Sequence, residues 1–214
     1  MLARFWLAVA AMVAVVTASN ILVQFPVQAD LGPIHLGDLL TWGAFTYPFA
    51  FLVSDLTNRF DGPGRARIVV VIGIAAALCL SAFLAPPRIA IASATAFLVG
   101  QLLDIAVFSR LRNRFWLVPP LSASLLGSLL DTAIFFSIAF APPFAFIDAF
   151  FNAPDGSLAM PAPWLGIGTQ VPLWLSLASG DFSVKFLAAL LLLVPYRLLM
   201  NAVMPLRPVA ASGA

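Results

Sequence analysis

The sequence predicts an all-α polytopic membrane protein, and composition and the spacing of apolar runs carry this prediction. The 214-residue chain is 62% hydrophobic and only 9% charged, and its mean hydropathy is +1.04. Long apolar runs recur along the chain, and Pro, Gly or Arg residues separate them. A water-soluble protein needs a more polar surface than this composition can supply. We therefore expect a single transmembrane domain over residues 1–214, embedded in a lipid bilayer.

Six segments are long enough to form membrane-spanning helices, each of which needs about 20 apolar residues. They cover residues 4–25, 39–60, 66–85, 88–110, 117–141 and 181–204. The small residues Thr17, Ala18 and Ser19 also resemble a signal-peptide cleavage site. Because the first apolar run continues to Phe25, we expect an uncleaved first helix.

The segment 142–180 breaks this pattern, because it is rich in Pro and carries an apolar patch interrupted by Gly166, Gly168 and Pro172. A short seventh span is one interpretation of this patch. We favour an interfacial or re-entrant segment on the outer side of the membrane, with Trp164 and Trp174 at the level of the lipid headgroups.

The basic residues predict the orientation of the helices, since short cytoplasmic loops are enriched in Lys and Arg. With six spans, one side of the membrane receives most of the arginines: Arg4, Arg59, Arg65, Arg67, Arg110, Arg112, Arg114 and Arg207. Arg88 is the only basic loop residue on the opposite side. Both termini are therefore expected in the cytoplasm, and in a bacterium the protein would lie in the inner membrane as a multi-pass protein.

Several function classes lack support in the sequence. The basic residues do not cluster as nucleic-acid binding requires, although the pI is about 9.2. A single cysteine, Cys79, and a single histidine, His35, leave little for a metal site or a cofactor. No membrane helix carries a histidine or a Ser–His or HExxH pattern, so an intramembrane enzyme is only a remote alternative.

Three aspartates inside the apolar segments, Asp55, Asp104 and Asp131, are the first candidates for a functional site. An Asp at the centre of a membrane helix costs about 2.5–3.5 kcal/mol on insertion scales, so such residues usually face a bundle interior or a cavity. The rise of about 1.5 Å per helical residue gives each polar residue an approximate depth. Asn20, Asp131 and Lys185 fall in the outer half, Gln101 near the midplane, and Asp104 and Asp55 in the inner third. The polar residues thus form two tiers.

Helical spacing favours a substrate role for part of this set. Gln101 and Asp104 are three positions apart along one helix, and Ser124, Ser128 and Asp131 follow one stripe of another helix. Serine stripes are also common packing material between membrane helices. Gln101, Asp104 and Asp131 are harder to explain by packing, and we expect them to contact a substrate.

Two acid–base pairs at i, i+4 spacing have structural alternatives. Asp55 precedes Arg59, and this pair could pin a helix end at the cytoplasmic interface. Asp181 precedes Lys185, which could form an outer clasp, or Lys185 could neutralise Asp131 across the bundle. We expect these residues to support the site.

Several motifs on different helices together resemble the queuosine-precursor transporter family, also called the VUT or YhhQ family. The resemblance covers about residues 16–141 and 181–205, and the segment 142–180 departs from it. Its motifs are Asn20, Thr41-Trp-Gly-Ala-Phe-Thr-Tyr-Pro-Phe49, Ser54-Asp55-Leu-Thr-Asn-Arg59, Gly100-Gln-Leu-Leu-Asp104, Val107-Phe108, Arg110-Leu-Arg112, Ser124, Gly127-Ser128, Asp131-Thr132 and Phe135-Phe136.

The resemblance implies a six-helix inner-membrane importer that salvages 7-cyano-7-deazaguanine or its 7-aminomethyl form for tRNA modification. It also implies a bundle similar to the substrate-binding subunits of energy-coupling-factor vitamin transporters. A deazaguanine presents an N1–H and an exocyclic amine side by side, which one carboxylate can accept as a pair. Trp42 or Phe108 could stack on the ring, and Asn20 and Ser128 complete the expected substrate contacts.

The sequence allows two kinds of partner. The chain could be the substrate-capture subunit of an ATP-driven uptake system, with an ATPase module docked at the loop of Arg110, Arg112 and Arg114. It could also form a homodimer.

Overall fold

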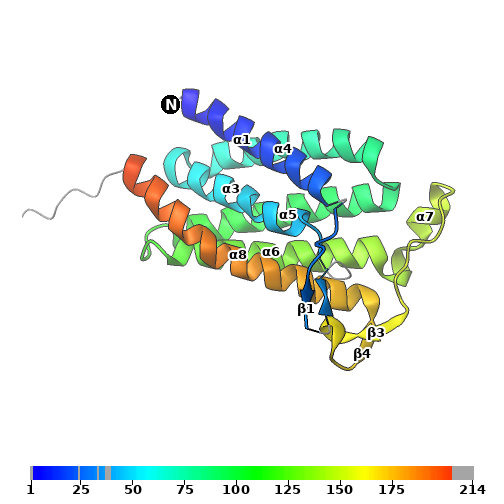
Figure 1. Ribbon diagram of the computed structural model, residues 1–214. Coiled ribbons are helices and arrows are strands. Elements are labelled where there is room, and N and C mark those ends of the chain that lie inside the picture. Colours follow the sequence, from blue (N-terminus) through cyan, green and yellow to red (C-terminus); the bar gives the residue numbers. More distant parts are fainter. Residues whose placement is uncertain (1, 24, 33, 37–39, 204–214) are drawn as a thin grey trace, which may run out of the picture.

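The structure is a computed structural model, and it describes residues 2–23, 25–32, 34–36 and 40–203. Long helices lie side by side in one bundle (Figure 1). They are α1 (Leu2–Leu22), α3 (Pro48–Asp61), α4 (Pro63–Leu84), α5 (Pro87–Leu111), α6 (Val118–Phe140) and α8 (Leu173–Val203). In the described part of the chain, all of these except α3 are long and apolar enough to cross a membrane, which makes five candidate spans. The protein is therefore an all-α polytopic membrane protein.

The second expected span is divided at Pro48 into the short helix α2 (Gly43–Thr46) and the 14-residue helix α3. Proline has no N–H to donate to the carbonyl of Ala44, four residues earlier, and its ring disfavours a continuous helix. Residue 39, the expected start of this span, lies outside the described residues, as do residue 204 and the C-terminal Arg207.

Helix α8 begins at Leu173 rather than at Asp181, the expected start of the last span. Its 31 residues correspond to about 46 Å at the usual rise per residue, longer than the roughly 30 Å hydrocarbon core of a bilayer. The first turns of α8 therefore extend beyond a perpendicular crossing and carry part of the segment predicted to be irregular.

Two short β-hairpins lie at one end of the bundle, which we call the hairpin end (Figure 1). Strand β1 (Asp30–Leu31) pairs antiparallel with β2 (Ile34–His35), and β3 (Pro161–Pro163) pairs antiparallel with β4 (Gln170–Pro172). The turn η3 (Trp164–Gly166) connects the second pair, and the indole Nε1 of Trp164 donates to Ser179 Oγ on α8 at 2.9 Å. The second hairpin is thus anchored to α8.

A buried arginine joins the remaining elements of the hairpin end, η2 (Pro142–Phe144) and α7 (Phe146–Phe150), to α5. Arg88 is 1% exposed and pairs with Asp148 at 2.7 Å, while it also donates to the carbonyl of Ala141 at 2.6 Å. Asp155 lies 3.5 Å from the same guanidinium, and hydrogen bonds from Ser157 lower the pKa of Asp155. Segment 142–157 is therefore held by one cation.

The opposite end of the bundle, which we call the arginine end, contains the start of α1 and the last described residues of α8 (Figure 1). Between the two ends, α1, α3, α4 and α5 enclose an apolar core around Met12, Val16, Val69, Val70 and Phe97. This core holds the helices that surround the site.

Candidate functional site

A cavity of about 460 Å³ lies in the half of the bundle next to the hairpin end. Helices α1, α2, α4, α5, α6 and α8 all contribute to its lining. Its volume falls within the range of about 300–1,000 Å³ typical of small-molecule sites. We call it the outer cavity. Its polar and charged lining residues are Ser19, Asn20, Thr41, Tyr47, Ser81, Ser93, Asp131, Asp181 and Lys185.

The floor of the outer cavity is a cluster of charged residues centred on Lys185. The ammonium Nζ lies 2.7 Å from Asp131 Oδ2 and 2.6 Å from Asp181 Oδ2, and it donates to Thr132 Oγ1 at 3.1 Å. The hydroxyl of Tyr47 donates to the other oxygen of Asp131 at 3.1 Å. Both proposed partners of Lys185, the neighbour on α8 and the aspartate across the bundle, therefore bind it at the same time. We call these five residues the Lys185 cluster.

The walls of the outer cavity differ in character. Between α1 and α4, Ser81 Oγ donates to Asn20 Oδ1 at 3.0 Å, and between α1 and α2 the hydroxyls of Ser19 and Thr46 form a hydrogen bond of 3.0 Å. On α6, Phe135 and Phe136 meet edge to face with ring centroids 5.1 Å apart. One wall thus offers polar groups and another offers aromatic surface.

The break at Pro48 shapes this cavity. Ala44, whose carbonyl loses its usual helical donor, and Tyr47, the residue between α2 and α3, both line the cavity. Helix breaks at membrane depth are tolerated where the freed backbone lines a cavity or packs in protein. The kink also brings the Tyr47 hydroxyl onto Asp131 of α6.

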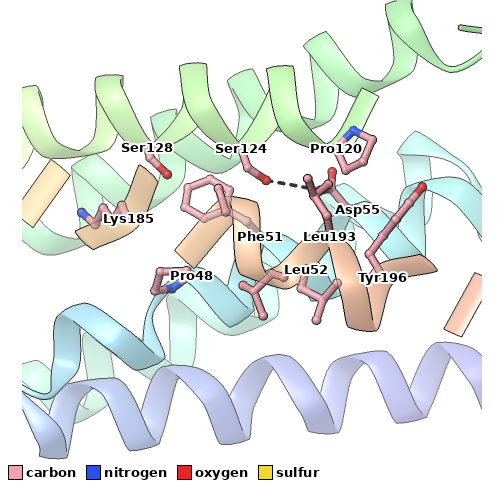
Figure 2. A pocket seen from close by; sticks show the side chains of 12 residues that line it. Pro48, Phe51, Leu52, Asp55, Pro120, Ser124, Ser128, Lys185, Leu193 and Tyr196 are labelled. Atoms are coloured by element: carbon pink, nitrogen blue, oxygen red, sulfur yellow. Dashed lines mark hydrogen bonds between the residues drawn. The ribbon is translucent and has the colours of Figure 1, made fainter. Parts of the chain in front are cut away.

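A second, narrow cavity of about 20 Å³ continues from Lys185 toward the arginine end (Figure 2). Ser128 and Ser124 follow one another along α6 on one side of it, and Asp55 lies beyond them. The hydroxyl of Ser124 donates to Asp55 Oδ2 at 3.3 Å. This volume is enough for about one water molecule. Polar groups thus connect the floor of the outer cavity with the inner tier.

The inner tier is a pair of carboxyl groups, Asp55 on α3 and Asp104 on α5, which are 2% and 0% exposed. Asp104 Oδ2 accepts a hydrogen bond from Ser54 at 3.0 Å. The side chain of Gln101, one turn before Asp104, is also fully buried. In the described part of the chain, both amide atoms of Gln101 and one oxygen of each carboxyl lack a hydrogen-bond partner.

A close approach of α5 and α6 fixes the relative positions of the two tiers. A Cβ atom on Gly127 would lie 3.0 Å from the carbonyl oxygen of Gly100 and 3.1 Å from Asp104 Cβ. A Cβ atom on Gly100 would lie 2.8 Å from Asp131 Cβ. Only glycine leaves room for the helices at this distance, and each glycine touches one of the carboxylate residues.

The arginine end is closed by a group of side chains around Arg59. Its guanidinium donates from Nε to the Tyr196 hydroxyl at 3.2 Å and from Nη1 to the carbonyl of Arg112 at 2.8 Å. Arg112 donates in return to the carbonyl of Arg59, and the Arg59 guanidinium lies 5.4 Å from the Phe108 ring centroid. These contacts tie α3, α5 and α8 together below the inner tier.

The residues predicted to contact substrate occupy several places. Asn20 and Asp131 line the outer cavity, and Ser128 lines the narrow cavity. Gln101 and Asp104 lie in the buried inner region, and neither is among the described lining residues of the two cavities. Trp42 is 49% exposed and packs on Phe45, whereas Phe108 is buried beneath Arg59.

Several lining residues were absent from the predicted substrate contacts. Tyr47 was visible only as part of the Tyr-Pro motif, and its direction depends on the kink that follows it. Thr132, quoted only as part of the Asp131-Thr132 motif, is not among the described lining residues, but it donates to Asp181 and accepts from Lys185. Phe140 and Ser93 gave no sequence signal beyond their helical positions.

The outer cavity is suited to a flat, neutral or cationic molecule rich in N–H donors. Two carboxylates and one ammonium give the Lys185 cluster a net charge of −1 when all three groups are ionised. Carboxylate oxygens can accept more than one hydrogen bond each, so a ligand can bind Asp131 without displacing Lys185. Among the described residues, no group of His, Cys, Asp or Glu is arranged to hold a metal ion.

Known proteins similar to this chain are transporters. The sequence model of the family described as "Putative vitamin uptake transporter" matches residues 80–200. The "Queuosine precursor transporter" of Escherichia coli strain K12 is 33% identical over 221 aligned positions, which cover 93% of this chain and 87% of that protein. A "Probable queuosine precursor transporter" of Haemophilus influenzae is 38% identical, covering 61% of this chain and 68% of that protein. No solved structure matches the chain significantly.

Proposed function

This chain belongs to the queuosine precursor transporter family, and we propose that it carries queuosine precursors across the membrane through the outer cavity. The substrates we infer are 7-cyano-7-deazaguanine and its 7-aminomethyl form. The observation that carries the proposal is a cavity of about 460 Å³ inside a membrane bundle, with a carboxylate cluster on its floor and phenylalanines on one wall. Because the relatives of this chain are transporters, we assign the cavity to transport and not to catalysis.

The chemistry of the Lys185 cluster supports this substrate class. A deazaguanine offers an N1–H and an exocyclic amine on one edge, and Asp131 or Asp181 can accept both in a bidentate contact. Phe135 or Phe136 offers a surface for stacking the ring, and Asn20 also lines the cavity. In this assignment Asp131 is the principal contact and Lys185 positions it.

The arginine end is assigned to the cytoplasm, since short cytoplasmic loops are enriched in basic residues. Arg65 and Arg67 lie near the start of α4 at this end, Arg110 lies in the last turn of α5, and Arg112 follows that helix. The outer cavity then lies toward the exterior, and the Arg59 contacts close the cytoplasmic side. In a bacterium this is an importer of the inner membrane with cytoplasmic termini.

Uptake of a labelled precursor by cells that cannot synthesise it tests the proposal. Cells that express this chain should accumulate label and restore queuosine in tRNA, whereas Asp131→Asn should abolish both. Asp155→Asn is the matched control, because Asp155 is an exposed aspartate of the hairpin end that does not line the cavity. If cells with correctly inserted wild-type protein take up no more label than cells without it, the proposed function is refuted. Uptake into liposomes that contain only this chain excludes the ATP-driven alternative.

A further inference from the structure

The inner carboxyl pair, Asp55 and Asp104, does not line the outer cavity, yet its two side chains are the most deeply buried acids of the described bundle. Asp55 and Asp104 are 2% and 0% exposed, and a serine hydroxyl donates to one oxygen of each, from Ser124 and Ser54 respectively. The second oxygen of each carboxyl has no hydrogen-bond partner in the described part of the chain. Leaving such an oxygen buried without a donor is unfavourable.

The two carboxyl groups also lie close together, because Ser54, which precedes Asp55 on α3, donates to Asp104 on α5 at 3.0 Å. Ionised carboxylates only accept hydrogen bonds, so two of them have no donor to share. If one carboxyl holds a proton, it becomes the donor for its neighbour, and one charge disappears. Two adjacent buried carboxylates cannot both remain ionised at low cost.

The charges around the inner carboxyl pair also favour one bound proton. On α3 the nearest cation is Arg59, and on α8 the facing groups are Tyr196 and, across the narrow cavity, Lys185. Arg112 at the end of α5 lies farther out, on the carbonyl of Arg59. Lys185 is already matched by two carboxylates of its own cluster. Arg59 lies one helical turn from Asp55, so two ionised carboxylates would leave at least one buried charge without a cation of its own.

Gln101 provides an independent observation. It is 0% exposed, and neither its amide nitrogen nor its amide oxygen has a partner in the described part of the chain. It precedes Asp104 by one helical turn, so its amide lies on the same face of α5 as that carboxyl. A buried amide can follow either protonation state of a neighbouring carboxyl, because it offers both a donor and an acceptor.

The narrow cavity supplies a connection to the substrate site. It runs from Lys185 past Ser128 and Ser124 to Asp55, and its volume of about 20 Å³ admits about one water molecule (Figure 2). Hydroxyl groups and one water are sufficient to pass a proton, whereas they leave little room for a hydrated metal ion. Lys185 lines both cavities, so the two tiers share a side chain.

We propose that Asp55 and Asp104, with Ser54, Ser124 and Gln101, form a proton-binding site that is separate from the substrate cavity and couples transport to a proton gradient. The pair holds one proton in the conformation described, and the proton leaves when the arginine end opens and hydrates the two carboxyl groups. The coupling role rests on the proposed transport function, whereas proton binding by the pair does not.

Infrared difference spectroscopy of the purified protein tests proton binding without any substrate. A pH titration of the wild type should reveal the C=O band of a buried protonated carboxyl group. Asp104→Asn should remove this band, and Asp55→Asn should shift it, because the hydrogen-bond partner changes. Asp131→Asn, which alters the outer tier, should leave it in place. A wild type without the band, or a band unchanged in Asp104→Asn, overturns the proposal.

Transport in liposomes with a clamped membrane potential tests the coupling. One pH unit per proton corresponds to a factor of about ten, so a gradient of about one unit should give about tenfold accumulation of labelled precursor. Asp104→Asn should lose accumulation but retain exchange of label at equal pH, which also shows that the variant is folded. The coupling is overturned if the wild type exchanges label but does not accumulate it in a pH gradient, or if a sodium gradient drives accumulation. Either result leaves the transport function intact. Absence of exchange in the wild type refutes the transport function itself.

Discussion

Replacing Gly127 by alanine should destabilise the protein by forcing α5 and α6 apart. The added Cβ would lie 2.8 Å from a Phe51 ring carbon, 3.0 Å from the carbonyl oxygen of Gly100 and 3.1 Å from Asp104 Cβ. Ordinary van der Waals contacts lie near 3.5–4.0 Å. Phe51 can rotate, but the backbone of Gly100 cannot move without its helix. Overpacking of this kind costs about 1–3 kcal/mol.

Thermal unfolding in detergent measures this cost. For a chain of this size, 1 kcal/mol corresponds to about 2–4 °C in the melting temperature, so the expected loss is about 2–12 °C. Gly64→Ala is the matched control, because a Cβ at Gly64 meets nothing within 4 Å, and alanine is the better helix former. Precursor uptake should also fall in Gly127→Ala at temperatures where the variant is still folded, because the separation of the helices displaces Asp104. Equal melting temperatures for the two variants would show that α5 and α6 accommodate the added Cβ without cost, which refutes the overpacking argument.

Further predictions address the outer cavity and the hairpin end. Tyr47→Phe removes the hydroxyl that donates to Asp131. The apparent Kd for the precursor should rise about 10- to 150-fold, since a hydrogen bond to a charged group is worth about 1.5–3 kcal/mol. The net charge of −1 on the Lys185 cluster should favour the cationic aminomethyl precursor over the cyano form in competition assays. Asp181→Asn removes this net charge and should abolish the preference. A preference that is unchanged in this variant contradicts the role of charge. Arg88→Met leaves Asp148 buried without its cation and should lower the free energy of unfolding by about 3–5 kcal/mol. An unchanged unfolding transition would show that the segment 142–157 does not contribute to the stability of the bundle.

The sequence predicted the class of fold and the existence of two polar tiers, because both follow from one-dimensional spacing. The rise per residue places Asp131 and Lys185 at a similar level, and the structure joins them at 2.7 Å. The same reasoning places Asp55 and Asp104 together at a deeper level, where Ser54, the neighbour of Asp55, donates to Asp104 at 3.0 Å. Depth along a helix is therefore recoverable from residue numbers alone.

Rotation about each helix axis is not recoverable in this way. Trp42 and Tyr47 belong to the same motif, yet the kink at Pro48 leaves Trp42 half exposed and directs Tyr47 to Asp131. Likewise, Phe108 follows Asp104 by one turn, but it packs under Arg59 rather than beside a cavity. The angle at a kink and the packing of neighbouring helices decide these directions, and neither is encoded in local spacing.

Lys185 determines how the two tiers can communicate. Among the described residues it alone lines both cavities, and its ammonium is held by one carboxylate of its own helix and one of α6. A substrate that passes from the outer cavity toward the arginine end must separate α8 from α6 at this point, which breaks the contact with Asp131. Breaking a buried ion pair costs several kcal/mol unless another donor replaces the lost one. A precursor whose N–H groups bind Asp131 supplies that donor, so the occupied cavity can open at lower cost than the empty one. Because Asp181 lies on the same helix as Lys185, it keeps the ammonium paired while α8 moves.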